Sequence, residues 1–96
     1  MSFKQYNYKA PIKKEGCCFC CDCYLAGLNG NEIEEAFDFG VANGYVRGSD
    51  CYVLNHGLID ALKRKYGRAG RSGKRVNVGG HFVVQNSQGQ TIFNPA

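Results

Sequence analysis

The stretch GCCFCCDCYLAG, residues 16–27, decides the fold of this chain. Apolar side chains recur along it at three- and four-residue steps, which is the period of a helix. The opposite face is also apolar, and Asp22 is its only charge. A helix that is apolar nearly all round belongs in the middle of a protein. The sequence therefore predicts a buried helix that begins at Cys17, with the rest of the chain packed around it.

Two further helices and an extended lead-in are expected around this central helix. Asn31 and Glu34 have the spacing of a capping box, which predicts a helix over about 32–43. Another helix, over about 56–66, has basic residues in its last turn, where cations suit the helix dipole. Between the two, a short strand or turn is expected. Residues 1–15 are expected to form an extended lead-in that a proline interrupts.

The carboxy-terminal third of the chain has the pattern of strands. After a loop rich in glycine and arginine the apolar period changes to two. Short strands are expected near 76–79, 81–86 and 90–94. Helices followed by antiparallel strands make an α+β fold. At 96 residues the chain is expected to be a single domain, 1–96, in which the cysteine-bearing helix and the further helices pack on a small antiparallel sheet.

The last two strands are expected to form a hairpin. A turn centred between Ser87 and Gln88 would place His81 opposite Asn94, and would place like side chains opposite each other along the ribbon. Directly opposed side chains are close enough for a hydrogen bond between His81 and Asn94. A turn of three residues would shift this register by one and break this pairing.

Charge is distributed unevenly along the chain. Residues 1–60 hold five basic and eight acidic groups, a balance of −3, whereas residues 61–96 hold seven basic groups and no acidic group, a balance of +7. A surface this positive attracts anions such as a nucleotide or a nucleic acid. The candidate anion-binding residues are in the glycine-rich loop: Arg68, Arg71, Lys74 and Arg75. The competing interpretation is a solvated surface loop, because the phosphate-loop spacing is absent.

Several classes of protein are disfavoured by composition. No apolar run approaches the roughly 20 residues that a membrane helix needs, so no membrane partner is expected. Met1 to Glu15 lacks the apolar segment of a secretory signal, which favours a cytoplasmic location and reduced thiols. Five of the six cysteines lie within residues 17–23, where disulfides would close almost no loop. The Cys-x-x-Cys spacings there resemble half a zinc site, but only Cys51 with His56 or His81 is available for the other half. No metal or cofactor is therefore expected, and a zinc-dependent module stays an alternative.

A cysteine at the start of a buried helix, with a His–Asn pair on a later sheet, is the arrangement that thiol hydrolysis needs. The amino terminus of a helix stabilises a thiolate, an imidazole accepts the proton, and an amide orients the ring. Cys17 is the preferred nucleophile because it directly follows Gly16, although Cys18 stays open. The remaining cysteines, Cys20, Cys21, Cys23 and Cys51, are assigned to packing. His56 is assigned a structural role.

Three segments carry a resemblance to a known family: Gly16-Cys17 at the start of an apolar helix, Gly80-His81-Phe82-Val83-Val84, and Ile92-Phe93-Asn94-Pro95. Together they resemble the papain-like cysteine peptidases, and among these the compact branch that includes the bacteriocin leader-processing peptidases. The resemblance runs from Gln5 to Pro95 and implies a papain-like fold. Its departures are Cys18 in place of the glycine usual after the nucleophile, and Asn94 where that branch often has aspartate.

The resemblance implies roles for four residues. Cys17 would be the nucleophile, His81 the general base and then acid, Asn94 the residue that orients the imidazole, and Gln5 an oxyanion donor beside the backbone N–H of Cys17. The expected function is cysteine-dependent hydrolysis or acyl transfer at a peptide or amide bond. The alternative is an inactive relative, similar in size to phage-encoded accessory domains, that binds an anionic ligand through the basic loop.

Overall fold

Two short helices begin the fold within residues 4–96, the part of the chain that the computed structural model describes. Helix α1 spans Ala10–Glu15, and a single 3₁₀ turn precedes it at Gln5–Asn7. The expectation of an extended lead-in is therefore wrong. Pro11 lies in the first turn of α1, where the missing N–H does no harm because that group has no intrahelical partner.

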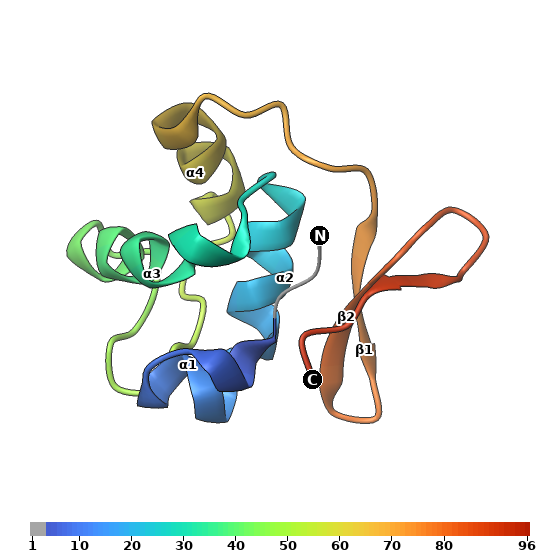
Figure 1. Cartoon of the computed structure of the whole chain (residues 1–96), viewed down its shortest axis with the longest axis horizontal. Coiled ribbons are helices and arrows are strands. Elements are labelled where there is room, and N and C mark those ends of the chain that lie inside the picture. The colour runs from blue at the N-terminus through green and yellow to red at the C-terminus, as the bar shows by residue number, and fades with distance from the viewer. Residues whose placement is uncertain (1–3) are drawn as a thin grey trace.

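A glycine allows α2 to start directly after α1. Gly16 is buried, and a Cβ added there would collide with the backbone of Ile12. Helix α2 spans Cys17–Leu25, which confirms the predicted central helix. Figure 1 shows α2 between the other helices and the sheet. This position explains why the helix is apolar nearly all round.

Helices α3 and α4 lie on the side of α2 that faces away from the sheet (Figure 1). Helix α3 spans Ile33–Ala42 and helix α4 spans Leu58–Tyr66, close to the predicted ranges. The capping box lies two residues earlier than expected, because a 3₁₀ turn at Gly30–Glu32 precedes α3. In this box Glu32 Oε1 accepts a hydrogen bond of 2.8 Å from the backbone N–H of Asn29.

The connection between α3 and α4 doubles back on itself. Val46 and Val53 form an isolated antiparallel bridge, which confirms the short strand or turn expected there. Cys51 lies between them, fully buried, with a φ of 60° that is uncommon for a residue with a side chain. This connection forms one wall of a pocket beside α2.

Three antiparallel strands complete the α+β fold in the order β1-β2-β3. Strand β1 spans Lys74–Val78, β2 spans His81–Gln85 and β3 spans Thr91–Phe93. All three expected strands are present, although β1 begins two residues before the predicted range. The sheet packs on α2, where the rings of Tyr24 and Phe93 stack with centroids 4.4 Å apart.

The predicted register of the last hairpin is wrong. The backbone N–H of Asn86 donates to the Gln90 carbonyl at 2.9 Å, so the loop has three residues and ends at Gly89, whose φ is 78°. This is the three-residue hairpin loop with glycine in the left-handed region. A bulge then shifts the pairing further, and Val84 lies opposite Phe93 instead of Thr91.

The buried side chains of helices and sheet form one hydrophobic cluster. The two ends of the described chain meet beside it, since the backbone N–H of Gln5 donates to the Pro95 carbonyl at 2.8 Å. Across residues 4–96, the helices are all too short or too polar to span a bilayer.

Candidate functional site

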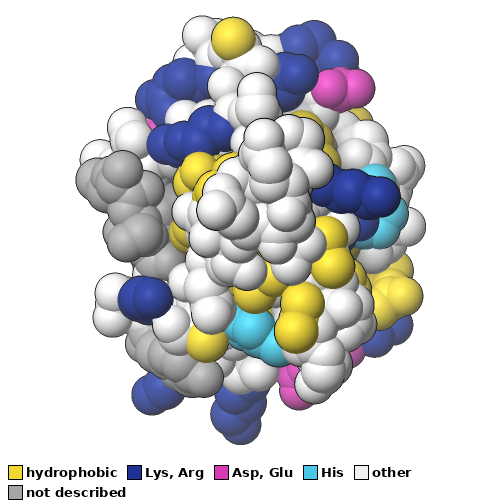
Figure 2. Space-filling view, turned by 90° about the vertical axis from the view of Figure 1, so that its right-hand side faces the viewer, with side chains coloured by type: hydrophobic (Ala, Val, Ile, Leu, Met, Phe, Trp, Pro, Cys, Tyr) yellow, Lys and Arg dark blue, Asp and Glu magenta, His cyan; other side chains and the backbone are white. Residues whose placement is uncertain are grey.

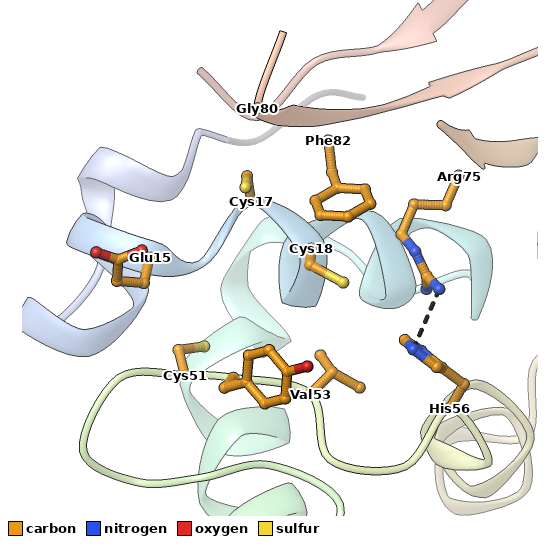
Figure 3. A pocket seen from close by; sticks show the side chains of 10 residues that line it. Glu15, Cys17, Cys18, Cys51, Val53, His56, Arg75, Gly80 and Phe82 are labelled. Atoms are coloured by element: carbon orange, nitrogen blue, oxygen red, sulfur yellow. Dashed lines mark hydrogen bonds between the residues drawn. The ribbon is translucent and has the colours of Figure 1, made fainter. Parts of the chain in front are cut away.

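A pocket of about 260 Å³ opens beside the amino terminus of α2. Figure 3 shows its walls: the start of α2 and the sheet on one side, and the α3–α4 connection on the other. Its lining residues are Glu15, Cys17, Cys18, Cys51, Tyr52, Val53, His56, Arg75, Gly80 and Phe82. The volume is near the lower end of ligand pockets, which suits a small group or one side chain of a larger ligand.

Cys17 occupies the first position of α2 and is half-buried in the wall of this pocket. The positive end of the helix dipole lies at this position and favours an anion such as a thiolate. In Figure 3 the Cys17 side chain lies on the side of α2 that faces Gly80, the residue before His81. The structure thus places the predicted nucleophile at an accessible helix terminus.

The surroundings of the other five thiols disfavour a thiolate. Burial, reinforced by the Asp22 carboxylate, raises the pKa of Cys18 to about 11. Burial also raises the pKa of Cys51 to about 12. The three remaining cysteines are fully buried and burial raises the pKa of each: Cys20, Cys21 and Cys23. The assignment of these three and of Cys51 to packing is confirmed.

The predicted hydrogen bond between His81 and Asn94 is present, with 2.8 Å between His81 Nε2 and Asn94 Oδ1. Asn94 Oδ1 also accepts the backbone N–H of Ala96 at 3.0 Å. Because Oδ1 can only accept, His81 Nε2 carries the proton and Nδ1 of the neutral ring is free to act as a base. Continuing the observed register places the two residues diagonally across the ribbon, still within reach of each other.

Cys17 and His81 come from packed elements, α2 and β2. Gly80, the neighbour of His81, shares the pocket wall with Cys17. No hydrogen bond joins the Cys17 thiol to the His81 ring among the residues that the structure describes. Nucleophile–base contacts are often long in unliganded enzymes and shorten on substrate binding.

Gln5, the predicted oxyanion donor, is buried near the end of α1. Its Nε2 donates to the Lys13 carbonyl at 3.2 Å. Its Oε1 is buried and has no hydrogen-bond partner within residues 4–96. The Gln5 side-chain amide is therefore hydrogen-bonded to the segment just before Cys17. Gln5 is not one of the residues that line the pocket.

The arginines of the basic loop bind the protein's own acceptors. Arg68 forms two hydrogen bonds with the Glu32 carboxylate, at 2.9 and 2.7 Å. Arg71 donates to the backbone carbonyls of Tyr24 and Leu28, at 2.8 and 2.9 Å, near the end of α2.

The other two candidates for anion binding lie in β1. Arg75 pairs with Asp22, whereas Lys74 is exposed. Figure 2 shows lysine and arginine side chains spread over several parts of the sheet-side face instead of gathered in one patch. The structure does not bring the four predicted anion-binding residues together into one open cationic surface.

Sequence reasoning missed a cluster at the end of the pocket opposite Glu15. Asp22 is fully buried and accepts from Arg75, and its other oxygen lies 3.5 Å from Nδ1 of His56. Burial raises the pKa of Asp22, while Arg75 and then His56 act against that shift. A single carboxylate in an apolar helix indicates that a positively charged residue pairs with it in the core, but the sequence does not show which residue this is.

Metal-ligating residues are not gathered in the described part of the chain: no three His, Cys, Asp or Glu side chains there are placed to hold an ion.

Comparison of the chain with protein-family models, with curated proteins and with solved structures finds no match.

Proposed function

We propose that this domain is a cysteine-dependent hydrolase or acyl-transfer enzyme that acts on a peptide or amide bond. The observation that carries the proposal is the hydrogen bond of 2.8 Å between His81 Nε2 and Asn94 Oδ1, on a sheet that packs against the helix headed by Cys17. This bond fixes the tautomer that leaves Nδ1 as a proton acceptor. The relationship to papain-like peptidases is part of the same proposal and rests on the motifs around these residues.

The proposed reaction has two steps. In the first, His81 takes the proton of the Cys17 thiol, sulfur attacks the carbonyl carbon, and the C–N bond breaks. The amine leaves with the proton that His81 held, and an acyl thioester remains on Cys17. In the second, water gives a proton to His81 and attacks the thioester carbon, the C–S bond breaks, and the protonated thiol is restored. In acyl transfer an amine or alcohol replaces the water.

Cys17 is preferred to Cys18 as the nucleophile on physical grounds. Only the thiolate attacks, so a thiol whose pKa is raised is a poor candidate. The pKa of Cys18 is raised to about 11 by burial and by Asp22. Cys18 lies four residues before Asp22, a spacing that makes the two side chains neighbours on the helix surface, whereas Cys17 lies five residues before it and begins the helix.

The test uses p-nitrophenyl acetate, a simple acyl donor that needs no knowledge of the natural substrate. The expected result is a burst of nitrophenolate equal to one per chain, with acetyl found on Cys17 by peptide mass mapping. Cys17→Ala should abolish the burst and the matched Cys18→Ala should keep it. His81→Ala should slow acylation by about 100-fold or more, as expected for loss of a general base.

Thiol alkylation provides a second readout. Iodoacetamide should label Cys17 faster than the five other thiols, and His81→Ala should suppress that labelling. Uniformly slow labelling of all six thiols, or labelling that does not depend on His81, would contradict the proposal. Circular dichroism of each variant ensures that the comparison is made between folded proteins.

A further inference from the structure

Asp22 of α2 contacts both Arg75 of β1 and His56, which lies before α4. Figure 3 shows Arg75 and His56 side by side at one end of the pocket. Asp22 is fully buried, the Arg75 side chain is 20% exposed, and the His56 side chain is 55% exposed. The cluster therefore runs from the core to the surface. Its outer members, Arg75 and His56, line the pocket.

The hydrogen bonds of the cluster leave one acceptor unsatisfied. Arg75 Nη1 donates to Asp22 Oδ1. Asp22 Oδ2 is buried and has no hydrogen-bond partner among the described residues, and the nearest ring nitrogen is His56 Nδ1 at 3.5 Å. A proton on Nδ1 would therefore point toward a buried carboxylate oxygen that lacks a donor. This favours His56 with Nδ1 protonated.

The second ring nitrogen of His56 faces a cation. Nε2 lies 3.4 Å from Nη2 of Arg75. In the neutral ring Nε2 is an acceptor and the guanidinium donates to it. In the charged ring Nε2 is also a donor, so two N–H groups face each other at the pocket wall. An oxygen that carries negative charge could accept from both of them at once.

We propose that Arg75 and His56, held in place by Asp22, bind a carboxylate or phosphate oxyanion at this end of the pocket, and that His56 takes up one proton as the anion binds. The site is separate from Cys17 and does not depend on the proposed hydrolase activity. The site also differs from the anion-binding loop expected from the sequence, because Arg75 acts there with His56, which comes from another part of the chain. Carboxylate and phosphate groups share the feature that this site would bind, a pair of oxygens that carry negative charge.

The charges of the cluster agree with a link between anion binding and protonation of His56. Asp22 and Arg75 balance each other, so the cluster gains a net positive charge only when His56 is protonated. Facing the cluster from α2 is the Cys18 thiol, whose pKa of about 11 keeps it neutral near neutral pH. The remaining titratable groups around the pocket are Glu15 at the opposite end, Cys17, Cys51 and Tyr52.

The chain offers an internal control for measuring this site. It contains two histidines, and Figure 2 shows their side chains well apart on one face, one of them against a basic side chain. Heteronuclear NMR of the isotope-labelled protein can follow both rings during titrations with sodium acetate and with inorganic phosphate. His81 then reports non-specific effects of salt.

The titrations are made at about pH 5.5 and about pH 8, on either side of the range in which histidine changes charge. Saturable shifts of the His56 ring and of the Arg75 side chain, stronger at the lower pH, are expected with one or both anions. Acetate is mostly ionised at both pH values, and its small neutral fraction at the lower pH would weaken binding there, so stronger binding at the lower pH reports on the protein. Comparison of the two anions shows whether the site prefers a planar carboxylate or a phosphate.

Variants separate binding from folding. His56→Gln should abolish the pH dependence and weaken binding, and the double variant Asp22→Asn/Arg75→Gln should abolish saturable binding without leaving a buried unpaired charge. Arg64→Gln, at an exposed arginine of α4, is the matched control and should bind as wild type does. Absence of saturable shifts with both anions, equal shifts at His81, or equal affinity at the two pH values would overturn the proposal.

Discussion

Replacement of Arg75 by glutamine removes the partner of a carboxylate that has no access to solvent. Asp22 has an exposed side-chain fraction of 0%, and Arg75 donates a hydrogen bond to it. Glutamine keeps only the first part of the side chain, is too short to take the place of the guanidinium, and carries no charge. The remaining neighbour, His56 Nδ1 at 3.5 Å, is too far away to replace a direct ionic hydrogen bond. Arg75→Gln therefore leaves an uncompensated charge in the core.

The expected loss of stability is large for a domain of this size. Removing one partner of a buried ion pair costs about 3–5 kcal/mol. A domain that is stable by roughly 5–15 kcal/mol loses a substantial part of its stability in this way. Asp22→Asn should cost less, about 1–3 kcal/mol, because the partly exposed Arg75 can turn toward water. The double variant should be more stable than Arg75→Gln alone.

Urea unfolding followed by circular dichroism, with reductant present to keep the thiols reduced, measures these differences. For a small domain, 3–5 kcal/mol corresponds to a midpoint lower by roughly 2–3 M urea. The four proteins of the cycle give the coupling energy between the two side chains directly. A loss of less than about 1 kcal/mol for Arg75→Gln, the level of an exposed pair, would refute the reasoning.

The pH dependence of the Arg75→Gln variant has a definite sign. Burial raises the pKa of Asp22, and removing Arg75 removes the largest opposing effect. A folded-state pKa above the unfolded one gives stability that is complete below the unfolded pKa and is lost as pH rises through the folded pKa. The deficit of Arg75→Gln relative to the double variant should therefore be larger at neutral pH than in mild acid.

Three further outcomes are expected. Gly70→Ala should lower stability by about 1–3 kcal/mol in thermal unfolding, because φ is +90° there and a Cβ would lie 2.6 Å from a carbonyl oxygen of α2. The hydrogen bonds from Arg68 lower the pKa of Glu32, so the stability that this pair contributes should be present near neutral pH and lost as acid protonates Glu32. In melting curves recorded over a series of pH values, Glu32→Gln should lack this loss of stability in acid. Phe19→Ala should cost about 3–5 kcal/mol in urea, whereas the exposed Val78→Ala should change stability by less than about 0.5 kcal/mol.

The helices and strands of this chain could be predicted because their signals are local. The apolar stretch of residues 16–27 indicated a buried helix, and the change from a helical period to a period of two indicated the sheet. The first helix was missed because its six residues are too few to show a period and Pro11 was interpreted as an interruption. Proline in the first turn of a helix is in fact favourable, so position within the element matters more than residue type.

The hairpin shows a different limit. Ser87 and Gln88 are compatible with a two-residue turn, but Gly89 is a local signal for the three-residue loop, because glycine is favoured at its left-handed position. The bulge next to it places Phe93 opposite Val84, and the Phe93 ring stacks on Tyr24 of α2, a tertiary contact that the local sequence does not show. The hydrogen bond between His81 and Asn94 forms nevertheless, because polar side chains reach diagonal neighbours as well as opposed ones.

The pairing of Asp22 with Arg75 could not be predicted, because 53 residues separate the partners in the sequence. It changes the meaning of the uneven charge distribution. Two arginines of the basic carboxy-terminal part neutralise carboxylates of the acidic amino-terminal part, through Arg75 and Asp22 and through Arg68 and Glu32. Two of the seven positive charges that suggested a nucleic-acid surface therefore hold the sheet and its preceding loop to the helices. Because salt screens exposed charges more than buried ones, raising the salt concentration should weaken the exposed ion pairs slightly and leave the buried Asp22–Arg75 pair largely unaffected. A Glu32→Gln variant should accordingly lose only the share of the salt dependence that this pair contributes, because the exposed pairs Lys9–Asp38, Arg47–Asp50 and Lys63–Asp60 remain. The variant Asp22→Asn/Arg75→Gln should retain the salt dependence of wild type.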